Sequence, residues 1–247
     1  MLTEKLDLPL LKRQVLAALE IPVWQLRKVE TGVAKATPTT LPGEPTRVPE
    51  VNQVQAVGQL NWQQLRQWVA ECQSCELHAQ RTQTVFGVGS ESADWLIIGE
   101  APGQEEDLRG EPFVGRAGQL LDNMLRAINL TRNQIYIANV IKCRPPGNRD
   151  PHTAERVACN DYLLRQIALL QPKIIIVVGR VAAHALLSTD ESVGKLRGRE
   201  LSFGENEIPV VVTYHPAYLL RAPLEKMKVW DDLCFARERY NKRLAEG

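Results

Sequence analysis

The sequence predicts an α/β protein with three layers, in which helices cover both faces of a central, mainly parallel four-stranded sheet. Two observations lead to this prediction. Four short runs are rich in apolar β-branched residues and mostly do not alternate with polar ones, as is typical of strands covered on both faces: 95–98, 135–140, 174–178 and 210–213. Helical patterns separate the first three runs, and this alternation favours parallel strands.

Capping residues and prolines predict where the helices begin. Asn61 can cap a helix that runs through Trp62 to Cys72. Asp150-Pro151 offers a cap followed by a proline for a helix over 154–170. Further helices are expected at three places: 120–128, from Gly179 to Leu187, and from Pro223 towards the C-terminus. In such sheets, ligands bind beyond the carboxyl ends of the strands, so a site is expected there.

The N-terminal segments differ in composition from residues 55–247, which we expect to form the main domain. Residues 31–54 contain closely spaced prolines that interrupt helices and sheets, so we interpret this segment as a linker. Within the extension 1–30, apolar residues between 10 and 19 have the spacing of a short helix. We expect a weakly ordered tail there; the alternative is a docking helix for a repair or replication protein.

Composition limits the classes of function. The 247 residues carry a net charge of +1, so any face that binds nucleic acid must be a local basic patch. No apolar run approaches the ~20 residues that a membrane-spanning helix needs. Charged residues near the N-terminus interrupt any signal-peptide pattern, so we expect a cytoplasmic protein of the bacterial type, in the cytosol or nucleoid, and a monomer.

Polar residues follow three of the four predicted strands. Glu100 lies in the segment GEAPG after the first strand, Asn139 ends the second, and His215 follows the fourth. Alone, Glu100 would be interpreted as a turn residue and His215 as a buried structural histidine. Because parallel strands end at one edge of a sheet, we instead expect a carboxylate, an amide and an imidazole to converge.

Four segments resemble, in order and spacing, the family 4 uracil-DNA glycosylases, the iron–sulfur branch of their superfamily: GEAPG, PFVGRAGQLL, IANVIKCRPPGNR and HPAYLL. The resemblance extends over roughly residues 60–240. It implies a uracil-DNA glycosylase-like fold and hydrolysis of the N-glycosidic bond between uracil and deoxyribose in DNA. The product would be an abasic site, as in base excision repair.

The resemblance also implies a uracil-binding pocket formed by six residues: Gly99, Glu100, Ala101, Phe113, Asn139 and His215. The Asn139 amide matches the donor and acceptor of uracil at N3 and O4, and it opposes the pattern of cytosine. Phe113 would lie against the flat face of the base. His215 and main-chain N–H groups near Glu100 would stabilise negative charge that develops on O2 of the leaving uracil.

A carboxylate near the sugar would favour an oxocarbenium-like species and orient the attacking water. Glu100 is the first candidate for this role, with Asn148 as a helper that positions water. Glu106 is a second candidate, and its alternative is a solvated loop charge. The best-known uracil glycosylases have an aspartate after the glycine-rich motif, where this chain has Ala101, so the water-activating group remains open.

Residues after His215 and near 194–198 are expected to bind DNA. Leu219 and Leu220 would wedge into the gap left by an extruded base. Four basic residues are candidates for phosphate contacts, although each could simply be solvated: Arg221, Lys195, Arg197 and Arg199. The 194–198 loop lacks the histidine of a related branch that becomes trapped on its product, so turnover is expected.

Four cysteines predict a metal site. Cys72 and Cys75 form a C-x-x-C motif, and Cys143 and Cys159 follow later in the chain. By chemistry alone, four thiolates could equally hold zinc. The family resemblance favours a 4Fe–4S cluster with a structural role. Cys234 has no partner motif, and we expect it to be a small buried hydrophobe.

Two other classes of function remain. A non-enzymatic iron–sulfur protein that binds nucleic acid would explain the cysteines, but not the convergence of Glu100, Asn139 and His215. A glycosylase of a sister family with broader base specificity would generally lack the glutamate of the first motif. A phosphate-binding loop is excluded, because Gly87-Val88-Gly89 precedes a strand instead of following one.

Overall fold

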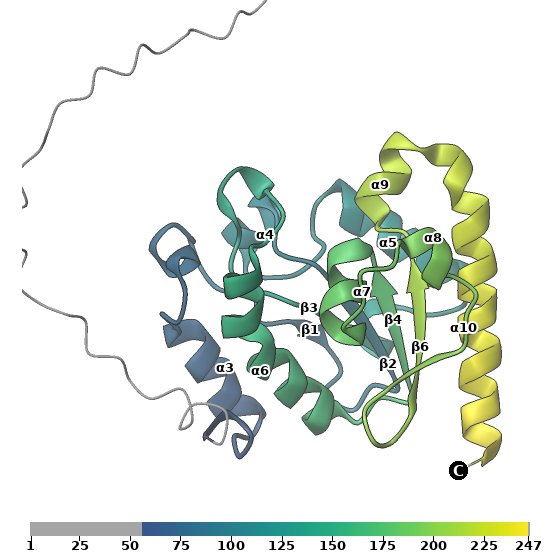
Figure 1. Cartoon of the computed structure of the whole chain (residues 1–247), viewed down its shortest axis with the longest axis horizontal. Coiled ribbons are helices and arrows are strands. Elements are labelled where there is room, and N and C mark those ends of the chain that lie inside the picture. Colours follow the sequence, from purple (N-terminus) through teal and green to yellow (C-terminus); the bar gives the residue numbers. More distant parts are fainter. Residues whose placement is uncertain (1–55, 247) are drawn as a thin grey trace, which may run out of the picture. The chain divides into compact units, whose positions relative to one another are not determined.

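The computed structural model describes residues 56–246, which contain a six-stranded sheet with helices on both faces (Figure 1). The strand order is β1-β3-β2-β4-β6-β5. The four central strands are parallel and correspond to the predicted runs: β2 (Trp95–Gly99), β3 (Ile135–Asn139), β4 (Ile174–Val178) and β6 (Ile208–Thr213). The predicted α/β class is therefore confirmed.

The prediction of only four strands is wrong, because two short strands pair at the edges of the sheet. Antiparallel β1 (Val88–Gly89) pairs with β3, and antiparallel β5 (Leu201–Phe203) pairs with β6. Two or three residues are too few to show a periodic pattern. At Gly89, a Cβ atom would lie 1.9 Å from the carbonyl oxygen of Ile135, so only glycine allows this pairing.

The described residues also form eight α-helices and four 3₁₀ turns. The helices are α3 (Trp62–Glu71), α4 (Gln104–Arg109), α5 (Arg116–Ala127), α6 (Thr153–Leu170), α7 (Arg180–Leu187), α8 (Val193–Leu196), α9 (Pro216–Arg221) and α10 (Lys226–Glu246). The turns are η1 (Glu76–Ala79), η2 (Arg132–Gln134), η3 (Pro146–Asn148) and η4 (Pro223–Glu225). None of these helices is long and apolar enough to cross a bilayer.

Alternate residues of each central strand pack into two separate apolar cores. In β2, Leu96 and Ile98 face the core that includes residues of α3, α6 and α7. Their neighbours Trp95 and Ile97 face the core that includes residues of α5 and α10. Figure 1 shows α3 and α6 on one side of the sheet and the long α10 on the other. Both faces are thus covered, which explains the continuous apolar runs.

The capping prediction is confirmed for α3 and corrected for α6. The Asn61 side chain accepts a hydrogen bond from the Gln64 N–H at 3.0 Å, and the Gln64 side chain accepts one from the Asn61 N–H. At α6, the N-cap is His152 instead of Asp150. Glu155 accepts the His152 N–H at 2.7 Å and two bonds from Arg149, and these bonds fix the start of the helix.

The connections leave a crevice at the carboxyl edge of the sheet. From β2 the chain moves outward to β3, and then it returns across β2 to β4. The loops after β2 and β4 therefore leave in opposite directions. Ligands of open α/β sheets bind in the crevice between two such loops. The predicted N-terminal extension (1–30) and the predicted linker (31–54) lie outside the described residues.

Candidate functional site

A pocket of about 370 Å³ lies at this carboxyl edge, within the usual size range for small-molecule sites. Sequence-predicted residues from separate strand ends line it together: Glu100, Ala101, Phe113, Asn139, Asn148 and His215. Gly99 lies directly beside it. A Cβ atom at Gly99 would lie 2.4 Å from Asn139 Oδ1 and 2.7 Å from the Phe113 ring, so glycine lets these two groups approach.

The Asn139 side chain ends β3 as an unsatisfied acceptor. The residue is 2% exposed, and within the part of the chain described here its Oδ1 atom has no hydrogen-bond partner. Leaving a buried polar atom unpaired costs about 1–3 kcal/mol. Such exceptions are rare in native proteins and call for a specific explanation. A ligand that donates a hydrogen bond at this point would remove the penalty.

The loop that carries Phe113 is held in a strained conformation. Phe113 is buried, and its φ of +56° lies in the left-handed region, which non-glycine residues seldom adopt. Arg132 donates hydrogen bonds to the carbonyl oxygens of Pro112 and Phe113, and Asp122 binds the same guanidinium at 2.6 Å. The Phe113 ring lies 5.5 Å from the His215 ring between centroids. Strained backbone of this kind is concentrated at functional sites, where the surrounding structure holds it in place. The strain therefore indicates that the Phe113 ring must keep one position.

Glu106 holds the same loop from the other side. Its carboxylate accepts the N–H groups of Val114 at 2.9 Å and Gly115 at 3.1 Å, and that of Gly103 at 3.1 Å. Three main-chain donors bind its oxygens, and these bonds fix the loop of Phe113. Glu106 also lines the pocket, so it stays a second candidate for the water-activating group, and it is not a freely solvated loop charge.

His215 presents one defined nitrogen to the pocket. Its Nδ1 atom accepts a hydrogen bond from the Ala217 N–H at 3.1 Å, which leaves Nε2 to carry the proton of the neutral ring. Burial and, to a smaller extent, the nearby charge of Arg221 lower the pKa of His215 to about 4, while Glu106 opposes the change. Near neutral pH the ring is therefore uncharged and offers an Nε2–H donor.

Glu100 lines the pocket as a partly buried carboxylic acid. Burial and, to a smaller extent, the nearby carboxylate of Asp150 raise the pKa of Glu100 to about 7, while Arg180 and Arg156 oppose the change. Asp150 itself pairs with Arg180 at 2.6 Å. Asn148 also lines the pocket, and its Oδ1 accepts a bond from Arg144 Nε at 2.7 Å. Glu100 thus changes charge near neutral pH, as expected for a group that handles protons or water.

Some of the residues expected to contact DNA are exposed, whereas others are buried or bound to other parts of the protein. The prediction that Leu219 forms a wedge is wrong, because Leu219 is 0% exposed and packs in the core below α9; Leu220 is 41% exposed. The Arg197 side chain is bound within the protein: its Nε donates to Asp232 at 2.7 Å, and its Nη2 donates to the Lys228 carbonyl. Its contacts are therefore intramolecular.

The other basic candidates differ in their surroundings. Arg221 lines the pocket, and Lys195 is exposed in α8. Arg199 pairs with Glu191 at 2.5 Å, although both side chains are largely exposed. Sequence reasoning missed Tyr218, Arg149 and Asp150, which also line the pocket. All three lie within or directly beside the motifs HPAYLL and PPGNR, and this proximity could have indicated them.

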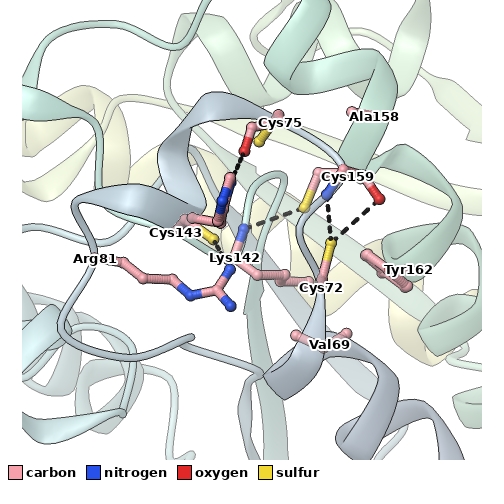
Figure 2. Close-up of a pocket in the computed structure, with 11 residues that line it drawn as sticks. Val69, Cys72, Cys75, Arg81, Lys142, Cys143, Ala158, Cys159 and Tyr162 are labelled. Carbon is pink, nitrogen blue, oxygen red and sulfur yellow. Dashed lines mark hydrogen bonds between the residues drawn. The ribbon is translucent and has the colours of Figure 1, made fainter. Parts of the chain in front are cut away.

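A second pocket brings the four predicted cysteines together from three segments of the chain (Figure 2): Cys72, Cys75, Cys143 and Cys159. Several N–H groups donate to their sulfur atoms. Arg81 Nη1 donates to Cys143 Sγ at 3.2 Å, and the Lys142 N–H donates to Cys159 Sγ at 3.3 Å. Such donors suit sulfur atoms that carry negative charge as thiolates.

The cysteine pocket has two further properties. Burial raises the pKa of the Cys159 thiol to about 12, and it also raises the pKa of Cys143, so a bound cation would be needed to deprotonate them. Within residues 56–246, no three His, Cys, Asp or Glu side chains are arranged to hold a single metal ion. Separately, the expectation that Cys234 is buried is wrong, because it is exposed on α10.

Comparisons with known proteins identify relatives of this chain. A family model described as the uracil DNA glycosylase superfamily matches residues 86–234. A type-4 uracil-DNA glycosylase from Archaeoglobus fulgidus is 43% identical over 161 residues, which is 63% of this chain and 81% of the relative. Those from Sulfurisphaera tokodaii and Thermotoga maritima are 42% and 43% identical, over 71% and 62% of this chain and 83% and 80% of the relatives.

Proposed function

Since this chain belongs to the type-4 uracil-DNA glycosylases of the uracil DNA glycosylase superfamily, we propose that it removes uracil from DNA. It is a hydrolase that cleaves the N-glycosidic bond between uracil and deoxyribose and leaves an abasic site. The observation that best supports this reaction is the buried, unpaired Oδ1 atom of Asn139, a residue that lines the pocket. An extruded base can supply the missing donor.

Base recognition is assigned to Asn139 and Phe113. Uracil carries a donor at N3 beside an acceptor at O4, and an asparagine amide offers the complementary acceptor and donor. Cytosine reverses this pattern and would leave the buried amide unpaired, which gives strong discrimination. Phe113 would lie against the face of the base, and the hydrogen bonds from Arg132 would keep the ring in place.

Bond cleavage is assigned to His215 and Glu100. As the bond breaks, negative charge develops on the uracil, and the neutral Nε2–H of His215 would stabilise it at O2. Positive charge develops on the sugar, and the ionised Glu100 would stabilise it and orient the attacking water. Asn148 would help to position that water through its remaining amide N–H groups, since its Oδ1 already binds Arg144.

For the DNA strand, we propose contacts by exposed residues beside the pocket. Leu220 takes the role of the wedge, because it is the exposed leucine of the pair that follows the histidine motif. Arg221 and Lys195 would contact phosphates. The modest net charge of the whole chain agrees with such a local patch.

For the second pocket, we infer that Cys72, Cys75, Cys143 and Cys159 hold a 4Fe–4S cluster. In such a cluster each thiolate binds a different iron, so the four sulfur atoms need not surround one point. The donors from Arg81 and Lys142 suit the negative charge of thiolates. When bound, the cluster supplies a structural tie between the segment after α3, the loop after β3 and helix α6.

A uracil-containing oligonucleotide with an end label tests the activity. The full chain should convert it to an abasic product that alkali cleaves, and an otherwise identical cytosine oligonucleotide should remain intact. Asn139→Ala should lower the single-turnover rate by about 10- to 100-fold, the equivalent of one buried polar interaction. An inactive wild-type protein, or an Asn139→Ala variant with unchanged rate, would contradict the assignment.

Anaerobic purification tests the cluster. The wild-type protein should be yellow-brown and contain iron and acid-labile sulfide. Cys159→Ser should lose the colour and the iron, whereas Cys234→Ser should retain both, because the exposed Cys234 lies outside the pocket. A colourless wild-type protein that contains zinc would instead support the alternative of a structural zinc site.

A further inference from the structure

Lys142 is a buried lysine to which none of the proposed roles applies. It follows β3 and is 1% exposed, although lysine is almost never fully buried unless it is paired. Within residues 56–246, the hydrogen-bond partners of its Nζ atom are uncharged oxygens, and no carboxylate pairs with it. It stands in the chain between Asn139, which we assign to base recognition, and Cys143, which we assign to the cluster.

Hydrogen bonds join Lys142 to both of these sites. Its Nζ atom donates to the main-chain carbonyl of Asn139 at 2.8 Å and to Gln166 Oε1 at 2.6 Å. Its main-chain N–H donates to Cys159 Sγ at 3.3 Å. Gln166 is itself fixed, because its Nε2 donates to the Phe86 carbonyl at 2.9 Å. The Lys142 side chain thus connects two anchored points inside the core.

The position of the Asn139 amide depends on the main chain that carries it. No described residue binds its Oδ1 atom, so this atom does not itself hold the side chain in place. On one side, the sheet holds the strand end through the bond from the Val140 N–H to the Gly99 carbonyl at 2.9 Å. On the other side, the Asn139 carbonyl is held by Lys142. A shift of about 1 Å in a recognition group can reduce a rate about 100-fold.

Burying an ammonium group is costly, and methionine or leucine would fill similar space without that cost. We propose that Lys142 is a positioning residue: it orients Asn139 for base recognition through the Asn139 carbonyl, and it ties that position to the cysteine site through its own N–H. This inference rests on the proposed excision of uracil. It also gives the cysteine site a role in base recognition that requires no redox change.

The test replaces Lys142 by methionine, which removes both side-chain bonds and leaves the main-chain N–H to Cys159. Four quantities are measured on the full chain: iron content, affinity for a duplex with a tetrahydrofuran abasic analogue, affinity for free uracil, and single-turnover excision of uracil. We expect iron content and abasic-analogue affinity to stay within about twofold of wild type. Uracil affinity and excision should both fall by about 10- to 100-fold.

Two further variants complete the test. Lys173→Met is the matched control: Lys173 is a half-exposed lysine that pairs with Asp94 at 3.3 Å, far from both pockets, and its loss should change none of the four quantities. Lys142→Arg keeps the charge and the donors, and its excision rate should lie closer to that of wild type than the rate of Lys142→Met does.

The outcomes are distinct. If Lys142→Met loses iron, solubility or abasic-analogue affinity in parallel with excision, Lys142 is a general structural residue and the proposal is overturned. Unchanged excision by Lys142→Met, with an active wild type, overturns it as well. Failure of the wild-type protein to excise uracil would instead refute the proposed function.

Discussion

The two ends of the parallel sheet carry polar residues in opposite states. At the amino end, Asp94 accepts a hydrogen bond from the Tyr240 hydroxyl at 2.6 Å and pairs with Lys173 at 3.3 Å. Tyr240 also lies 4.9 Å from the Trp95 ring between centroids. At the carboxyl end, the buried Asn139 Oδ1 atom has no partner within the described residues. Asp94 and Tyr240 thus satisfy each other at one end, whereas at the other end Asn139 lacks a partner that a ligand could supply.

This difference shows how one scaffold separates stability from function. Groups that bind each other stabilise the native state, because their hydrogen bonds are made without a ligand. Groups left unpaired, such as Asn139, lower stability and gain their partners from the substrate. Substitutions at the carboxyl end should therefore change catalysis more than stability, and those at the amino end should do the reverse.

The largest expected effect is that of His215→Ala at the carboxyl end. Loss of the Nε2–H donor should lower single-turnover uracil excision by about 100- to 1,000-fold, as for other preorganised donors to a developing anion. Stability should fall by only about 1 kcal/mol, since the bond from the Ala217 N–H that caps α9 is also lost. His184→Ala is the control, because His184 lies on α7 outside the pocket. A rate within threefold of wild type for His215→Ala would remove His215 from the mechanism.

An intermediate effect is expected from pH, through Glu100. With a pKa of about 7, its ionised fraction rises from about 10% at pH 6 to about 90% at pH 8. If the carboxylate stabilises the sugar cation, excision should rise about ninefold over this range, whereas Glu100→Gln should be slow with a flat profile. His215 stays neutral throughout, because its pKa is about 4. A wild-type profile that falls with rising pH would contradict this role.

The same pKa predicts that stability falls as pH rises, whereas the rate of excision increases. Because burial raises the pKa of Glu100 above its ordinary value, the native protein binds the proton more tightly than the unfolded chain does. The stabilising contribution is complete below the ordinary pKa and is lost as pH rises through about 7. Thermal unfolding at pH 5 and pH 8 should therefore show Glu100→Gln gaining stability relative to wild type at the higher pH.

The smallest expected effect on catalysis is that of Tyr240→Phe at the amino end. This substitution removes the hydroxyl that binds Asp94 and keeps the ring against Trp95. The free energy of unfolding should fall by about 1 kcal/mol, measured by denaturant titration, and excision should be unchanged. A tenfold loss of excision would show that the two ends of the sheet are not independent.

Sequence patterns predicted the fold where local chemistry is sufficient. Runs of β-branched residues identified the four central strands, and the Asn61 capping box identified the start of α3. The edge strands were missed because they contain two or three residues. The start of α6 was misassigned because Glu155, through bonds to His152 and Arg149, determines it.

For the candidate site, the order of the motifs predicted which residues meet, but not how each is held. Convergence of Glu100, Asn139 and His215 follows from parallel strands that end at one edge. The burial of Leu219 does not follow from its motif, because both leucines are equally apolar and only the packing of α9 decides which one faces inward. The same is true of the ion pair between Arg197 and Asp232.

By itself, the sequence determined the class of fold, the strands that form it and the chemical types gathered at their carboxyl ends. These properties depend on residues that are neighbours in the chain, where periodicity and capping act. Only the tertiary structure decided which polar atoms are paired, such as the Glu106 oxygens, and which remain unpaired, such as Asn139 Oδ1. Hydrogen bonding and burial depend on groups from distant segments, whose positions are fixed only when the whole chain has packed.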